Sequence, residues 1–239
     1  MTAGPASENR SPMGVTGSRR GALIAGVGGI LWVILALARV PLTRLLDQPS
    51  WTDDPSVIVD FYVNSSFDSG FITGIALVAV AYVLFFVFIA KTADLLGDVD
   101  GGSRWVSYLI VGGAAMDTVL VFAYLAPFAT AVFWAGHGGL SAEAYLTLHG
   151  LSISFLWIEL ITISVWMVPL GIGIIRTGLF TRWLGWLLLA NAVGLLVAFF
   201  LPYAVWAVLG GLPYLWILVA AITMLRRPDQ YSGTARVVA

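Results

Sequence analysis

Six long apolar runs constrain the fold of this chain more than any other feature of its sequence. The first run, GALIAGVGGILWVILALA, contains no charged residue. An α-helix rises about 1.5 Å per residue, so about 20 apolar residues cross the hydrocarbon core of a bilayer. The six runs predict transmembrane helices over residues 21–38, 70–90, 105–134, 150–175, 183–201 and 203–225.

The overall composition supports this assignment. The 239 residues are 59% hydrophobic and 10% charged, whereas about 25% of the residues in a soluble domain are charged. A water-soluble fold of this size could not hide so much apolar surface. We therefore expect an all-α, polytopic membrane protein whose main partner is the lipid bilayer. With a net charge of −1, the chain is not expected to bind nucleic acid.

The distribution of basic residues predicts the orientation. With the N-terminus inside, the outer segments hold only Arg39 and Arg44. The inner segments hold Arg10, Arg19, Arg20, Lys91, Arg104, Arg176, Arg182, Arg226, Arg227 and Arg236. This bias follows the positive-inside rule and places both termini in the cytoplasm. The expected organisation is a disordered tail over 1–18, a six-helix domain over 19–228 and a second tail over 229–239, in a bacterial inner (cell) membrane.

The longest predicted outer segment, residues 41–69, is acidic and contains a helix signal. Asp54 is placed to cap a helix that has Pro55 at its first position, and Val57, Ile58 and Phe61 then share one face. This pattern predicts a short amphipathic helix on the outer interface. In the next outer segment, Ser141 is expected to cap the following helix.

Two carboxyl groups fall inside the predicted spans. Asp117 is twelve residues from Trp105, or about 18 Å along a helix, and Glu159 is nine residues from Gly150, or about 14 Å. Both depths lie near the middle of a core about 30 Å thick. Since the two helices are consecutive and antiparallel, the carboxyls can meet.

Further polar residues at similar depth extend this candidate site. They are Asn191, Tyr214, Tyr82 and Thr162. A charge at the bilayer centre costs about 2.5–3.5 kcal/mol, and no Lys or Arg is predicted within a span. We therefore expect at least one of the two acids to be protonated, and to donate to the other acid, to Asn191 or to a backbone carbonyl.

Two interpretations of the polar site stay open at this point. The acids and Asn191 can join the helices by hydrogen bonds, as in a structural or accessory membrane subunit. Alternatively, they form a protonatable centre in a small transporter or permease-like protein. A homo-oligomer or a membrane-protein partner is compatible with either, and the sequence does not identify a small-molecule ligand.

No motif indicates an enzyme, a cofactor or a metal site. The chain lacks cysteine, and H-E-x-x-H, P-loop and G-x-S-x-G patterns are absent. The two histidines, His137 and His149, fall near the predicted outer surface, where we expect a solvated or capping role. We expect a non-enzymatic protein without cofactor or metal.

One segment resembles a known family. Residues Gly178, Leu179, Arg182, Trp183, Leu184 and Gly185 lie in GLFTRWLG. This segment is similar to the loop between helices four and five in a bacterial family of six-helix membrane proteins classed as a domain of unknown function. The resemblance implies a fold and a topology but no site. Its arginine and tryptophans are also typical of an interfacial anchor.

Overall fold

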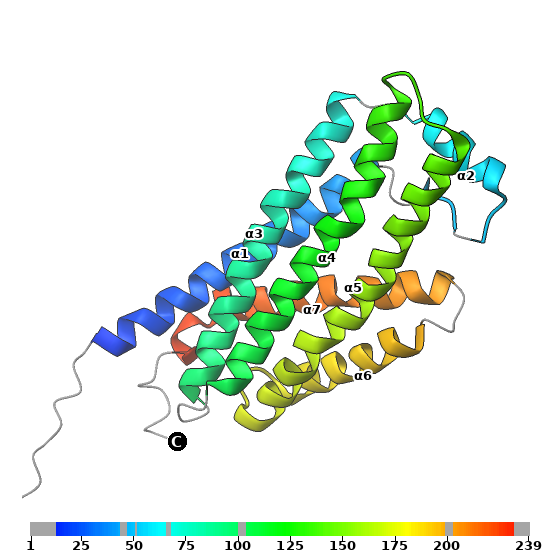
Figure 1. The fold of residues 1–239 in the computed structure, drawn as a ribbon. Helices are drawn as coiled ribbons and strands as arrows, with labels where there is room; N and C mark the ends of the chain where they lie inside the picture. The colour runs from blue at the N-terminus through cyan, green and yellow to red at the C-terminus, as the bar shows by residue number, and fades with distance from the viewer. Residues whose placement is uncertain are drawn as a thin grey trace, which may run out of the picture.

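The computed structural model describes residues 13–43, 47–50, 52–65, 68–99, 104–198 and 203–231, and this part of the chain is helical without a strand (Figure 1). The all-α prediction is therefore confirmed for these residues. The elements are α1 (Met13–Thr43), α2 (Pro55–Val63), α3 (Ser69–Val99), α4 (Trp105–Ala135), α5 (Ala142–Thr177), α6 (Arg182–Ala198), α7 (Tyr203–Arg226) and the short 3₁₀ helix η2 (Pro228–Tyr231).

Six of these helices form a closed ring in chain order. Each of α1, α3, α4, α5, α6 and α7 packs against the next, and α7 returns to α1. Figure 1 shows α1, α3, α4 and α5 running along a common direction, with α6 and α7 lying obliquely beside them. Residues of helices far apart in the sequence therefore face one interior.

Five helices are long and apolar enough to cross a membrane, and α6 is a shorter apolar helix. Their outward faces are apolar: Val83, Val119 and Val193 are each at least 60% exposed. Exposure of these apolar side chains to water would be unfavourable, whereas their exposure to lipid is not. Length and surface together indicate a membrane-embedded protein.

The helix ends differ from the predicted spans. α1 begins at Met13, inside the stretch predicted to be a tail, and continues to Thr43 instead of ending at Ala38. α5 starts at Ala142, eight residues before the predicted span, because Ser141 accepts a hydrogen bond from the Ala144 amide at 3.3 Å. Most of both predicted tails, residues 1–12 and 232–239, lies outside the described residues.

The short outer helix is present with the predicted cap. The Asp54 carboxylate accepts a hydrogen bond from the Ser56 amide at 2.8 Å, and Pro55 opens α2. Residues of the predicted apolar face differ in their burial. α2 packs on α4 and α5 through Ile58 and Tyr62, while Val57 is 49% exposed. The apolar side chains of α2 are therefore divided between the protein interior and the exposed surface.

Close backbone approach brings α4 against α5. A Cβ atom on Gly113 would lie 2.9 Å from the backbone nitrogen of Trp166, whereas one on the adjacent Gly112 would meet nothing within 4 Å. The missing side chain at Gly113 therefore lets the buried Trp166 ring lie beside the next turn of α4, which carries Asp117.

Candidate functional site

Asp117 lies on the inner face of α4 and is only 4% exposed. Its Oδ2 accepts a hydrogen bond from Trp166 Nε1 at 3.3 Å. Its Oδ1 is buried and finds no hydrogen-bond partner among the described residues. The hydrogen bond from Trp166 therefore positions Oδ2, whereas Oδ1 has no partner within the described chain.

Glu159 lies on the facing helix, α5, and is half-buried. Its carboxyl group lies within electrostatic range of Asp117, but no hydrogen bond joins the two acids. Thr162, which was expected to flank the acids, donates instead to the backbone carbonyl of Glu159 at 2.7 Å. The Thr162 hydroxyl therefore bonds to the backbone of α5 and not to the carboxyl group of Glu159.

Arg39 corrects the sequence analysis, which placed it in an outer loop. Because α1 continues to Thr43, Arg39 is helical and half-buried, and its guanidinium interacts electrostatically with Tyr82, Tyr214 and Glu159. Its Nε and Nη1 are buried and make no hydrogen bond within the described chain. The expectation that no arginine lies among the acids is wrong.

Tyr82 on α3 and Tyr214 on α7 complete what we call the central cluster: Arg39, Tyr82, Asp117, Glu159 and Tyr214. Tyr82 interacts electrostatically with the four other members. Helices α1, α3, α4, α5 and α7 each contribute one residue, so the cluster lies where the ring of helices encloses its interior. Depth counting along the sequence had already included both tyrosines in the candidate site, whereas Arg39 was not among the predicted site residues.

Aromatic rings surround the central cluster. Trp32 stacks on Tyr214 with ring centroids 4.7 Å apart, and Phe85 contacts both Trp32 and Trp166 at 5.4 and 5.6 Å. Trp32 is buried, and its Nε1 has no hydrogen-bond partner among the described residues. The rings exclude lipid from the polar groups and add one further donor.

Asn191 is the predicted site residue on α6, the ring helix from which no member of the central cluster comes. It is buried on α6, yet neither its amide nitrogen nor its amide oxygen makes a hydrogen bond in the described chain. The adjacent residue joins α6 to α5, because Ser164 Oγ donates to the Ala192 carbonyl at 3.0 Å. Asn191 therefore lies at the α5–α6 contact with its amide unsatisfied.

His149 corrects a second expectation. It was predicted to be solvated, but it is 2% exposed, and its Nδ1 lies 3.2 Å from the Tyr62 hydroxyl. α5 spans 36 residues, about 54 Å, so its first turns extend beyond a bilayer core and support α2. His149 therefore belongs to the packing of the outer helix.

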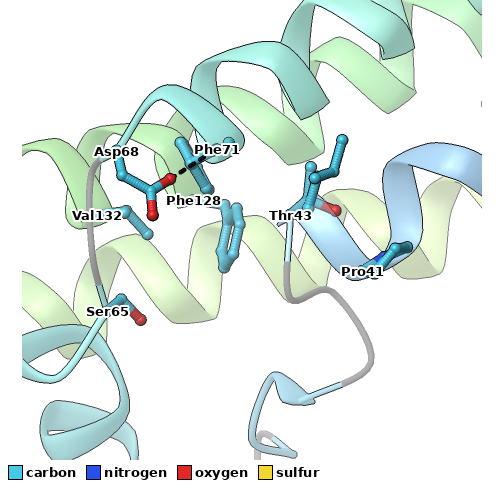
Figure 2. Close-up of a pocket in the computed structure, with 9 residues that line it drawn as sticks. Pro41, Thr43, Ser65, Asp68, Phe71, Phe128 and Val132 are labelled. Atoms are coloured by element: carbon cyan, nitrogen blue, oxygen red, sulfur yellow. Dashed lines mark hydrogen bonds between the residues drawn. The ribbon is translucent and has the colours of Figure 1, made fainter.

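A cavity of about 150 Å³ opens at the end of α1 (Figure 2). Its lining comprises Pro41, Leu42, Thr43, Ser65, Asp68, Gly70, Phe71, Phe128 and Val132. Thr43, which lines the cavity, follows Arg39 by one turn of α1, and its Oγ1 donates within that helix to the backbone carbonyl of Arg39 at 3.1 Å. No member of the central cluster lines the cavity.

The segment that resembles a known family forms the α5–α6 turn. Gly178 adopts a left-handed conformation (φ 65°) that ends α5, Leu179 and Leu184 are buried, and Trp183 and Trp186 are exposed. Outward tryptophans beside a tight turn fit an interfacial anchor. Comparisons with protein-family models, curated proteins and solved structures give no match. The family resemblance therefore stays a prediction.

Proposed function

We propose that this protein is a proton-coupled membrane transporter of a small polar solute, and that Asp117 and Glu159 carry the proton. The observation that carries the proposal is the central cluster itself. Buried donors on Arg39 and a buried acceptor on Asp117 make no hydrogen bond within the described chain. Such groups are costly in an apolar interior unless they serve a ligand or a proton.

The charges of the cluster suit alternating protonation. The cluster contains one guanidinium and two carboxyls, so it is neutral when one acid is ionised and the other is protonated. If the remaining protonated acid also ionises, the cluster has an excess negative charge. If both acids are protonated, the cluster has an excess positive charge. Either imbalance favours the movement of a charged or polar solute with the proton.

Access from one side is supported by the cavity at the end of α1. Its lining residue Thr43 lies one turn from Arg39 and bonds to the Arg39 carbonyl. Along α1 the cavity is thus one turn from the residue that supplies the guanidinium of the cluster.

A topology belongs to the same proposal. We propose six spans with both termini in the cytoplasm of a bacterial inner membrane, in agreement with the family resemblance. The closed ring of six helices and the bias of basic residues support this topology. α6 has 17 helical residues, about 25 Å, so it would cross a slightly thinned core.

A structural or accessory subunit is the second candidate function. The hydrogen bond between Trp166 and Asp117 favours it, because this bond ties α5 to α4 in the way that interhelical polar contacts stabilise bundles. This candidate predicts a membrane protein that co-purifies stably after gentle extraction. A preparation that contains only this chain would count against it.

The test is solute uptake in proteoliposomes with an imposed inward proton gradient. The solutes are labelled L-lactate, L-alanine and glucose, which represent anionic, zwitterionic and neutral classes. We expect the gradient to drive accumulation of one class, and a protonophore to abolish it. Asp117→Asn and Glu159→Gln should remove the accumulation while the melting temperature in detergent stays close to that of the wild type.

The matched control is Glu143→Gln, which makes the same chemical change at an exposed position of the same helix, α5. This variant should transport normally. If the wild type accumulates none of the three solutes, and both acid variants melt well below it, transport is refuted and the structural role is favoured.

A further inference from the structure

We infer that α2 is a lid that acid releases, and that His149 on α5 is the residue whose protonation releases it. At neutral pH the lid closes the cavity at the end of α1, and in acid it opens. The inference goes beyond the proposed function, because it concerns access to the cavity and not the solute that is carried. It rests on the contacts of His149 and on the small core beneath α2.

The first step concerns the core that α2 covers. Side chains of α2, α3, α4 and α5 form a buried cluster that shares no buried residue with the main core in the described chain. Its buried members are Ile58, Tyr62, Phe71, Phe128, Ala131, Val132 and Tyr145. Because this cluster is separate, α2 can leave it while the main core of the bundle stays packed.

The second step links α2 to the cavity. Ser65 follows the end of α2 by two residues and lines the cavity, and its amide donates to the Tyr62 carbonyl at 3.0 Å. Phe128 and Val132 line the same cavity from α4, and the Phe128 ring lies 6.0 Å from that of Tyr62 (Figure 2). A movement of α2 away from α4 therefore takes part of the cavity wall with it.

The third step concerns the hydrogen bond that holds the lid. The Tyr62 hydroxyl lies 3.2 Å from His149 Nδ1, and the two rings meet edge to face. His149 is 2% exposed, and its Nε2 is buried without a hydrogen-bond partner among the described residues. A neutral imidazole has one N–H group, whereas an imidazolium has two. Protonation of the docked ring would therefore bury a charged N–H group that has no acceptor.

The fourth step concerns the titratable groups that surround His149. They include three phenols, which do not ionise in acid: Tyr62 on α2, Tyr145 one turn earlier on α5, and Tyr124 on the facing part of α4. Asp53, which precedes α2, lies within electrostatic range and favours the imidazolium. Because the Asp53 side chain is exposed, water screens its charge. No buried anion in the described chain therefore stabilises a charged His149 in the docked state.

Acid consequently favours the released lid. His149 precedes the proposed span of α5, residues 150–175, so release of α2 exposes its ring to water. An imidazole in water has a pKa of about 6.5. Since the released state binds a proton more readily than the docked state, docking is complete above about pH 6.5 and weakens as the pH falls below it. The ratio of released to docked lid should rise by up to about tenfold per pH unit.

The experiment measures the distance between nitroxide labels on α2 and α4 by pulsed electron paramagnetic resonance in detergent. The labels are attached at Val57→Cys and Val119→Cys, which are exposed positions in a chain that has no cysteine of its own. At about pH 7.5 we expect one narrow distance. A longer and broader component should grow between about pH 6.5 and 5, where an imidazole titrates.

Three variants in the labelled protein identify the titrating residue. His149→Gln keeps a hydrogen-bonding side chain that does not titrate, so the longer component should not appear at about pH 5. His137→Gln is the matched control, because it makes the same change at the other histidine, which is exposed, and it should respond to acid like the wild type. Tyr62→Phe keeps the ring without the hydroxyl, so its released fraction at neutral pH should be about three- to tenfold higher.

The pH of the transition keeps the result decisive if His149→Gln does not fold. A transition above about pH 5 that persists in His137→Gln belongs to His149, because exposed carboxyl groups titrate near 4. A transition confined to pH values below about 4.5 would instead belong to carboxyl groups such as the Asp54 cap, and would overturn the inference.

A second measurement tests whether the lid covers the cavity. Val132→Cys places a thiol on the buried cavity wall, and its rate of reaction with a charged, water-soluble maleimide reports access. The rates with His149 and with His149→Gln are compared at the same pH, so the pH dependence of the thiol itself cancels. We expect similar rates at about pH 7.5, and a rate at least about threefold faster with His149 at about pH 5.5.

The inference is overturned if no second distance appears between about pH 6.5 and 5, or if His149→Gln responds to acid like the wild type. Movement of α2 without faster labelling of Val132→Cys would overturn its role as a lid on the cavity. Neither measurement uses flux, so failure of the uptake assay would reject transport and leave the lid. A lid that ignores acid would leave the transport proposal in place.

Discussion

Trp166 on α5 donates a hydrogen bond to Asp117 on α4 across a distance of 3.3 Å, and both side chains are buried. This pair joins two helices of the ring at the level of the central cluster. It also fixes one oxygen of a carboxyl group whose other oxygen has no partner in the described chain. Asp117 therefore contributes to the packing of α4 on α5 and belongs to the proposed proton site.

The first prediction concerns the donor of this pair. Trp166→Phe removes the N–H but keeps an aromatic ring, so Asp117 loses its partner. We expect the free energy of unfolding in detergent to fall by about 1–3 kcal/mol. The control, Trp186→Phe, changes an exposed tryptophan and should have little effect. Equal unfolding of both variants would show that the bond contributes nothing to stability.

The second prediction concerns the contact that holds Trp166 in place. Gly113→Ala would put a Cβ atom 2.9 Å from the Trp166 backbone, so α4 and α5 must separate. We expect a loss of about 1–3 kcal/mol in unfolding free energy, measured by denaturant titration in detergent. The neighbouring Gly112→Ala meets nothing within 4 Å and should be neutral or slightly stabilising. Identical curves for the two variants would contradict the packing described here.

The third prediction concerns Asn191. Its buried amide makes no hydrogen bond within the described residues, so Asn191→Leu removes an unsatisfied polar group. We expect the melting temperature to stay the same or to rise, because an unpaired buried amide costs about 1–3 kcal/mol. If Asn191 also lines the transport route, uptake of the accumulated solute should fall in the same variant. A large loss of stability would show instead that the amide has a structural partner.

The fourth prediction concerns the outer helix and acidic pH. Hydrogen bonds from the Ser56 hydroxyl and amide lower the pKa of Asp54 below its ordinary value of 3.8. A lowered pKa means that the capping contribution is complete above 3.8 and disappears as the pH falls through the folded-state pKa. Asp54→Ala should therefore loosen α2 at neutral pH and have no further effect in strong acid.

Hydrogen exchange of the α2 amides at several pH values measures this effect. Asp60→Ala is the matched control, since Asp60 is an exposed aspartate within α2 itself. The control should leave the protection of Val57 and Ile58 unchanged. Equal loss of protection in the two variants would refute a specific cap.

The fifth prediction concerns the C-terminal 3₁₀ helix and alkaline pH. Tyr231 packs on Phe180 with ring centroids 5.9 Å apart, and burial raises the pKa of Tyr231 to about 12. The folded state therefore favours the neutral phenol, so its contribution is complete below the ordinary pKa of 10 and is lost as the pH rises through 12. Proteolysis after Arg226, the exposed last residue of α7, should accelerate over this range.

Tyr231→Phe keeps the packing without the titration, so its cleavage rate should not rise over the same pH range. Arg19→Gln removes the exposed ion pair with Asp229, which joins η2 to α1 at 2.9 Å, and should change the rate only slightly. Parallel alkaline release of Tyr231→Phe and the wild type would exclude Tyr231 as the cause.

The sequence by itself determined the class of fold. Runs of apolar residues that match the bilayer thickness leave the backbone one way to satisfy its hydrogen bonds, which is a helix. Local signals also placed the Asp54 and Ser141 caps, because a cap depends on a few neighbouring residues. Counting residues along straight helices predicted similar depths for Asp117 and Glu159.

Only the tertiary structure decided which polar groups meet. Arg39 has the position of a loop residue when an apolar run is taken to end at Ala38, although it follows Trp32 by seven residues and therefore shares its helix face. Its place in the cluster depends on the closure of α1 against both α3 and α7. His149 was misjudged for the same reason, since its burial requires α2 to fold back onto α5. Contacts between helices that are distant in the chain have no local sequence signal. Such contacts place Arg39 in one cluster with the two predicted acids.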